Sequence, residues 1–128
     1  MTNGFEGFIL FASNENVFTH NVATNNGGPG VYAGFALLDG SSGNELTANT
    51  ANTNGDVGFV LEASSDNSLT RNISNANGLT GFEVRAGSGS NLLNRNVAHG
   101  NGNLDAMDDR TGSDNSWLDN NFGSTSGI

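Results

Sequence analysis

Two arginines are placed where they could bind a ligand together. Arg71 and Arg95 stand in the matching segments TRNIS and NRNVA, and each precedes an asparagine. A guanidinium group matches a carboxylate in a planar, two-pronged hydrogen bond, so a stacked pair could bind the carboxylate of an acidic sugar. Tyr32, which follows a glycine-rich insertion, is the third candidate for carbohydrate binding. The alternative, that both arginines are solvated surface residues, stays open.

A second cluster of candidate residues is acidic. Asp105, Asp108, Asp109 and Asp114 fall within ten residues of one another near the end of the sequence. Carboxylate oxygens are the ligands that calcium prefers, and these four could form an oxygen-ligand calcium site. Calcium is the one cofactor that the sequence suggests. The suggestion rests on the residue types alone, because their spacing matches no EF-hand loop and no glycine-rich nonapeptide.

Composition excludes several classes of function. The 128 residues carry 13 acidic and only four basic side chains, for a formal net charge of −9. Such a charge repels the phosphate backbone, so nucleic acid is not an expected partner. No apolar run has transmembrane length, and membrane insertion is not expected. The absence of cysteine removes thiolate chemistry, and the two histidines, His20 and His99, are too far apart in the sequence pattern to share a metal or a proton.

A repeat of about two dozen residues organises the whole chain. Gly-Phe pairs begin at Gly7, Gly34, Gly58 and Gly81, and within each unit three asparagines fall five residues apart. These asparagines are Asn16, Asn21 and Asn26; Asn44, Asn49 and Asn54; Asn67, Asn72 and Asn77; Asn91, Asn96 and Asn101; and, in a fifth unit, Asn115 and Asn120, with Thr125 in the third place. Fixed-period self-similarity of this kind is typical of solenoids.

The content of each unit predicts an all-β, right-handed parallel β-helix of about five coils with three short strands per coil. Each unit holds three strand-like pieces that end at Gly, Ser or Asn, and it lacks the 3.6-residue apolar periodicity of a helical repeat. Parallel strands joined by crossovers are right-handed in nearly all proteins. Residues 1–128 therefore form a single domain.

Equivalent residues of successive units should stack in columns. Phe8, Phe35, Phe59 and Phe82 are expected inside, as are the residues two positions after them, Leu10, Leu37, Leu61 and Val84. The asparagines should form ladders in which each amide donates to the equivalent amide of the next coil, and a turn asparagine also tolerates left-handed backbone geometry. The pattern does not decide whether the column of Ala23, Ala51, Ser74 and Ala98 or the adjoining column of Val22, Thr50, Ile73 and Val97 points inward.

Two units, GFVLEASSDNSLTRNISNANG and GFEVRAGSGSNLLNRNVAHGNG, resemble the repeats of right-handed parallel β-helix proteins of the pectin-lyase-like superfamily, with NosD-type repeats as the nearest pattern. The resemblance covers essentially the whole chain. It implies the fold, and it implies an extracellular or cell-envelope location. It leaves the activity open, because the superfamily includes polysaccharide lyases, hydrolases and epimerases, adhesins and proteins without known activity.

The outward positions of the first strand change character along the chain. Early units carry apolar residues there and late units carry charges, so we expect an exposed apolar patch, which usually marks an interface. The predicted interface residues are Ile9, Phe11, Ala36, Leu38 and Val60. The alternative is that Val31 and Tyr32, beyond the insertion at 27–30, cover part of the patch within the chain.

Three functional interpretations follow. The first is a non-catalytic extracellular module with a structural or carbohydrate-binding role. The second is a C-terminal fragment of a polysaccharide-active enzyme, because the chain opens within a coil and its last unit replaces core residues by Asp105 and Asp108, as a finished end would. The third is a solenoid that self-associates through its open N-terminal end.

Overall fold

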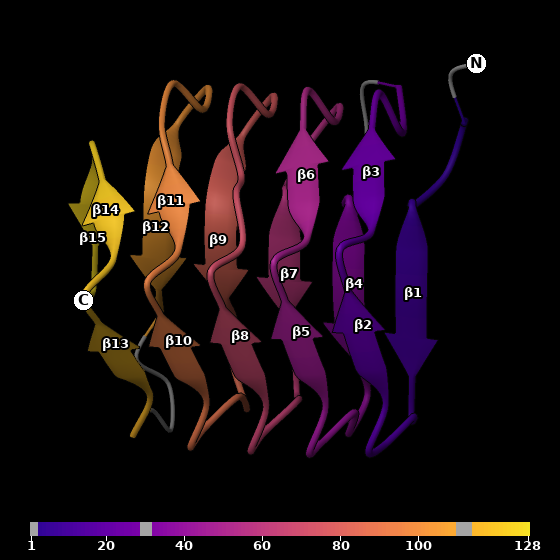
Figure 1. Cartoon of the computed structure of the whole chain (residues 1–128), viewed down its shortest axis with the longest axis vertical. Coiled ribbons are helices and arrows are strands. Elements are labelled where there is room, and N and C mark those ends of the chain that lie inside the picture. Colours follow the sequence, from indigo (N-terminus) through magenta and orange to yellow (C-terminus); the bar gives the residue numbers. More distant parts are fainter. Residues whose placement is uncertain (1–2, 29–31, 110–113) are drawn as a thin grey trace.

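The computed structural model describes residues 3–28, 32–109 and 114–128, and it is a stack of coils, each made of short strands (Figure 1). No helix in these ranges has the length and apolar character needed to cross a bilayer. Every strand pairing within the described residues is parallel, and it joins equivalent strands of neighbouring coils. The predicted all-β solenoid is confirmed.

Three faces run the length of the rod. The first is a six-stranded sheet formed by β1 (Phe8–Phe11), β4 (Phe35–Leu38), β7 (Phe59–Leu61), β9 (Thr80–Val84), β12 (Leu104–Asp108) and β15 (Thr125–Ser126). The second is a five-stranded sheet formed by β2 (Val17–Thr19), β5 (Glu45–Thr47), β8 (Ser68–Thr70), β10 (Leu92–Asn94) and β13 (Ser116–Leu118). On the third face β3 (Val22–Thr24) pairs with β6 (Thr50–Asn52) and β11 (Val97–Ala98) with β14 (Asn121–Phe122), and Ile73 bridges the two pairs.

The interior is a column of stacked rings between these faces. Phe8, Phe35, Phe59 and Phe82 lie in register, with ring centroids 4.7–4.8 Å apart and nearly parallel planes. The spacing equals the distance between neighbouring strands, so each strand pair brings one ring pair into contact. Ala51 from the third face is fully buried against the same core, which decides the open question of that face: the small-residue column points inward, whereas Val22 is exposed.

The glycine of each Gly-Phe pair is required by this close packing. A Cβ atom built on Gly34 would lie 2.8 Å from the Cβ of Ala51 and 2.8 Å from Nδ2 of Asn54. Both distances are too short for a Cβ atom, and the two neighbours cannot move aside because they are buried and closely packed. The recurrence of glycine therefore reflects the narrowness of the solenoid at this corner.

The asparagine ladders form as predicted. In the buried rung at Asn72, Nδ2 donates to Oδ1 of Asn96 at 3.2 Å and to the carbonyl oxygen of Leu46 at 2.8 Å, while Oδ1 accepts from the backbone N–H and Nδ2 of Asn49. The expected left-handed geometry falls elsewhere, however. It belongs to the residue before the asparagine, as in His20 (φ 57°) and Arg71 (φ 56°), because the asparagine itself must point inward.

The C-terminal end closes by exchanging large and small residues between faces. Ala106 stands where Phe82 stood one coil earlier, and Phe122 stands where Ala98 stood, so the Phe122 ring fills the space left by Ala106. Asp105 takes the next place in the third ladder, where its Oδ1 accepts from Nδ2 of Asn101 at 2.7 Å. The prediction that Thr125 fills this place is wrong: Thr125 pairs with Ala106 in the six-stranded sheet, since the chain has already turned the corner.

Candidate functional site

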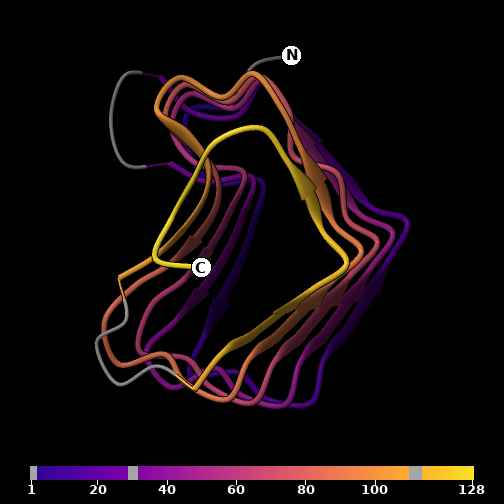
Figure 2. The same ribbon diagram turned by 90° about the vertical axis from the view of Figure 1, so that its left-hand side faces the viewer.

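A pocket of about 230 Å³ lies on the outer face of the six-stranded sheet. Seen along the axis, this sheet is the left-hand wall of the solenoid, and the turns on both sides of it project further outward (Figure 2). β4 and β7 provide the base of the pocket, and the residue after β9 closes it on the C-terminal side. Its lining residues are Glu6, Ala33, Ala36, Leu38, Asp56, Val57, Val60, Glu62 and Arg85.

The pocket has an apolar floor that is separate from the interior core. Ala33, Ala36, Val57 and Val60 form a second buried cluster, with Leu38 packed against it. Ala36 and Val60 alternate with the inward residues of β4 and β7 and so point outward, as predicted. Ala33 and Val57, which precede these strands, pack against them. The prediction that Ala36 and Val60 are exposed is therefore wrong, because they are 2% and 5% exposed.

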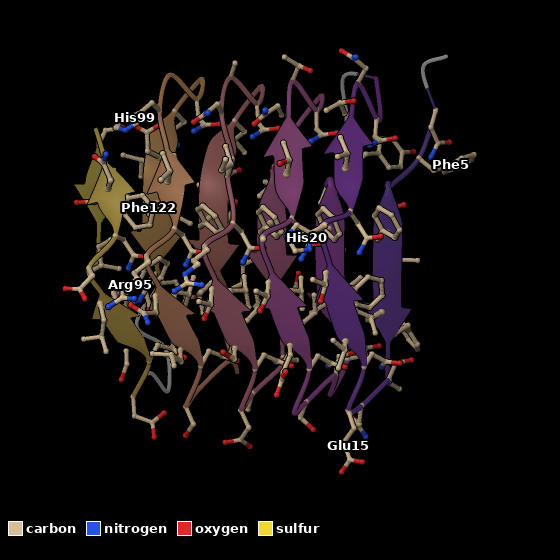
Figure 3. The ribbon with its side chains drawn as sticks, in the orientation of Figure 1. Phe5, Glu15, His20, Arg95, His99 and Phe122 are labelled. Atoms are coloured by element: carbon tan, nitrogen blue, oxygen red, sulfur yellow. The ribbon has the colours of Figure 1, made fainter. Side chains whose placement is uncertain are left out.

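Two of the three remaining residues of the predicted interface meet the expectation of exposure. Ile9 is 55% exposed and Phe11 is 60% exposed, whereas Leu38 is half-buried. Tyr32 makes an edge-to-face contact with Phe5, with ring centroids 5.8 Å apart, and Val31 lies outside the described residues. Self-association through this end stays a prediction; Figure 3 shows Phe5 projecting at the N-terminal end of the rod.

Ionic side chains form the C-terminal wall of the pocket. Nε of Arg85 lies 2.8 Å from Oε1 of Glu83, and its Nη1 lies 3.2 Å from Oε2 of Glu62. The register explains the arrangement: Glu83 stands beside Val60, one coil further along the same outward column. The alternation in FEVR placed both side chains outside, but the sequence alone did not show that turns would bury one of them.

Glu83 is held in an unusual environment for a carboxylate. The residue is only 6% exposed, and its Oε2 is a buried oxygen without a hydrogen-bond partner among the described residues. A buried acceptor without a donor is costly, by about 1–3 kcal/mol and more when charged. Such an atom is an exception that calls for a structural or functional reason.

The surroundings shift the pKa values of two neighbouring groups. Burial raises the pKa of Asp56 above its usual value; Arg85 acts against this shift and Glu83 adds to it. For Arg85, burial acts to lower the pKa, but the hydrogen bonds to and attraction by Glu83 and Glu62 outweigh it, so the guanidinium stays charged. The described lining of the pocket is thus mainly acidic, and its cation, Arg85, is already paired with two carboxylates.

The predicted arginine pair lies on another side of the solenoid. Arg71 and Arg95 occupy the turn between the five-stranded sheet and the third face, one coil apart as expected. Both are exposed, and Nε of Arg95 lies 3.8 Å from Oδ2 of Asp119, the next residue of the column. Figure 3 shows Arg95 on this turn, in front of the six-stranded sheet. Of the predicted carbohydrate-binding residues, only Tyr32 lies near the pocket, since its neighbour Ala33 lines it.

The four aspartates predicted to bind calcium are not brought together. Asp105 and Asp108 are buried, and each accepts hydrogen bonds inside the C-terminal coil: Asp105 from Ser124 and Asn101, Asp108 from the indole Nε1 of Trp117 at 3.1 Å. Asp109 is exposed, and Asp114 bonds to Ser90. Within the described ranges no group of three or more His, Cys, Asp or Glu side chains is arranged to hold a metal ion. Calcium binding stays a prediction.

Comparison with known proteins identifies the architecture. The crystal structure of the periplasmic alginate epimerase AlgG superimposes with a TM-score of 0.75 at 20% identity, covering 94% of this chain but 36% of that one. A double mutant of that epimerase gives a TM-score of 0.73, also at 20% identity, over 90% of this chain and 36% of that one. No curated protein matches the sequence. At this identity the likeness shows the fold, and the chain spans little more than a third of the epimerase.

The family comparison covers nearly the entire sequence. Residues 1–122 match the family described as right-handed beta helix region, which agrees with the parallel registers, the stacked phenylalanines and the ladders described above. The handedness expected from the general rule for parallel crossovers is that of the family. The chain therefore belongs to the right-handed β-helix family.

Proposed function

We propose that the chain is a carbohydrate-binding β-helix module, and that it holds saccharide on the outer face of its six-stranded sheet. The observation that carries the proposal is the pocket, whose apolar floor is bordered by Asp56, Glu62 and Arg85. Binding sites commonly combine an apolar lining with a few polar groups that fix orientation. A sugar ring offers the complement, because it presents C–H groups on its faces and hydroxyls at its edge.

The surface beside the pocket suits a polymer. Phe11, Leu38 and Glu62 succeed one another in a single outward column, and Arg85 continues it beyond β9. Consecutive members are about 4.8 Å apart, the strand spacing. The exposed Phe11 ring thus lies in line with the pocket and could stack on a neighbouring sugar unit. The epimerase that shares the fold acts on a polysaccharide and is periplasmic according to its name, which supports a saccharide ligand and an envelope or extracellular location.

Binding of the purified chain to a panel of neutral, acidic and amine-bearing oligosaccharides tests the proposal. Phe11→Ala and Glu62→Gln should each weaken binding about tenfold or more, because each removes one contact from the proposed surface. Arg71→Gln and Arg95→Gln are controls on another face and should leave the affinity unchanged. A blank panel, or a loss confined to the Arg71 and Arg95 variants, would refute the proposed site.

A second candidate function is that of a fragment of a polysaccharide-active enzyme. The observation in its favour is Asp56, whose pKa is raised within a pocket that also holds Glu62, since a carboxyl group with a raised pKa can act as a general acid. Incubation with the panel, followed by assays for new reducing ends, unsaturated ends and inverted sugar units, tests it. An Asp56→Asn variant that keeps any activity observed would exclude this role for Asp56.

A further inference from the structure

The charged residues that line the pocket indicate which class of sugar it binds, which its shape does not. Glu6, Asp56 and Glu62 line it, Glu83 is bonded to Arg85 in its C-terminal wall, and Arg85 is the one cation among the described lining residues. We infer that the pocket takes an amine-bearing saccharide, a sugar unit with a protonated amino group, in preference to an acidic sugar. This inference rests on the proposed function and specifies its ligand.

The first step of the argument concerns Arg85. A guanidinium that binds an acidic sugar must offer its charge to the ligand. Here Nε and Nη1 already donate to Glu83 and Glu62, at 2.8 and 3.2 Å, so two carboxylates neutralise one cation. A third carboxylate in the pocket would meet an excess of negative charge and would be repelled.

The second step concerns Glu83. Its Oε1 is bonded to Arg85, whereas its Oε2 is buried and unpartnered within the described part of the chain. The buried Oε2 does not open onto the pocket, but the charge of Glu83 adds to that of the lining carboxylates Asp56 and Glu62. An ammonium group brings three N–H donors and a positive charge, and it can pair with those lining carboxylates, whereas the carboxylate of an acidic sugar, which only accepts, cannot.

The third step concerns size and floor. A volume of about 230 Å³ is below the roughly 300–1,000 Å³ of pockets that hold drug-sized ligands, so the pocket has room for one small unit. Ala36 and Val60 provide the apolar floor against which the C–H face of one sugar ring can pack. Asp56 and Glu62 line the same pocket, so an amino substituent of a ring on this floor could pair with them.

The test compares three oligosaccharides of equal length by calorimetry: a glucosamine oligomer, its N-acetylated counterpart and a uronate oligomer. The glucosamine oligomer should bind at least about tenfold more tightly than the N-acetylated one, and the uronate oligomer should bind least. Because the preference is electrostatic, it should shrink as the salt concentration rises.

Variants locate the effect. Glu83→Gln and Glu62→Gln should each reduce the preference for the amine severalfold. Glu15→Gln is the matched control: it removes the same charge at an exposed turn between β1 and β2 that does not line the pocket, and it should leave the preference intact (Figure 3). Circular dichroism spectra verify that each variant is folded.

The outcomes separate the two proposals. Equal affinity for the amine and its N-acetylated form, or tighter binding of the uronate, would overturn this inference and leave carbohydrate binding standing. An equal loss of preference in Glu15→Gln would also overturn it, since the attraction would then come from net charge and not from the pocket. If none of the three oligosaccharides binds, both the proposed function and this inference fail.

Discussion

Buried polar groups inside the solenoid and on the outer face of its six-stranded sheet differ in how completely they are hydrogen-bonded. Inside, the buried amide of Asn72 has both hydrogens donated and its oxygen accepting twice. On the outer face, Glu83 is almost as deeply buried, yet one of its oxygens has no partner among the described residues. Buried polar groups are normally satisfied, so the first environment is typical of a stabilising network, and the second is an exception that lies beside the pocket.

Apolar residues show the same contrast. The phenylalanine column inside is continuous from Phe8 to Phe82 and contributes to a single core. The outer cluster of Ala33, Ala36, Val57 and Val60 is small and forms the floor of a pocket. Stability should therefore depend mainly on the interior, and ligand recognition on the outer face.

The largest effect expected concerns the ring stack. Phe59→Ala removes a fully buried ring that is stacked on two neighbours, and the free energy of unfolding should fall by about 3–5 kcal/mol. Chemical denaturation followed by circular dichroism measures it. Phe11→Ala, at an exposed ring on the outer face, is the matched control and should change stability by less than about 0.5 kcal/mol. Similar losses in the two variants would contradict the division between core and surface.

The next effect concerns the ladder. Asn72→Ala removes the acceptor of the backbone N–H of Asn49 and a side-chain donor to the carbonyl of Leu46 in a buried place, and we expect a loss of about 2–4 kcal/mol in unfolding free energy. Asn103→Ala changes an exposed asparagine whose side chain makes no hydrogen bond within the described residues, and it should be neutral. If both substitutions were neutral, the ladders would not stabilise the fold.

A smaller effect should appear as a pH dependence at the C-terminal end. Burial alone would raise the pKa of Asp105, but hydrogen bonds from Asn101 and Ser124 outweigh it and hold the pKa below its ordinary value of 3.8. The stability that this carboxylate contributes is complete above pH 3.8 and is lost as the pH falls through the lower pKa of the folded state. Asp105→Asn should lose about 1–3 kcal/mol at pH 7, and the difference from the wild type should shrink in acid. A constant difference down to pH 2 would contradict this assignment.

The smallest effect tests the outer face directly. Glu83→Gln should lower the pKa of Asp56, because the nearby negative charge contributes to its raised value, and Arg85→Gln should raise it further. Carbon-detected NMR titration of the Asp56 carboxyl measures both. Shifts of the same sign in the two variants would show that the pocket charges do not act on Asp56 as described.

Much of the fold could be predicted from the repeat, and less of the site. The columns of Phe35, Phe59 and Phe82, and the ladders, follow from spacing alone, because each coil places identical residues over one another. The core position of Phe122 was not predicted. The sequence does contain a signal for it, because the last coil has Ala106 at the phenylalanine position and Phe122 at the alanine position. The buried state of Ala36 and Val60 was missed, because alternation gives the direction of a side chain and not what covers it.

The sequence by itself determined that this chain is a parallel β-helix, since a period of about two dozen residues repeated along one chain allows each residue to stack on its own equivalents. Only the tertiary structure decided what the outer face offers. Ala36 and Val60 are equivalents in one column, and so are Glu62 and Arg85, but Ala33 and Val57 pack against these columns from the segments before β4 and β7. Local periodicity specifies contacts within a column, whereas the way in which different columns close together into a pocket depends on the path of the backbone.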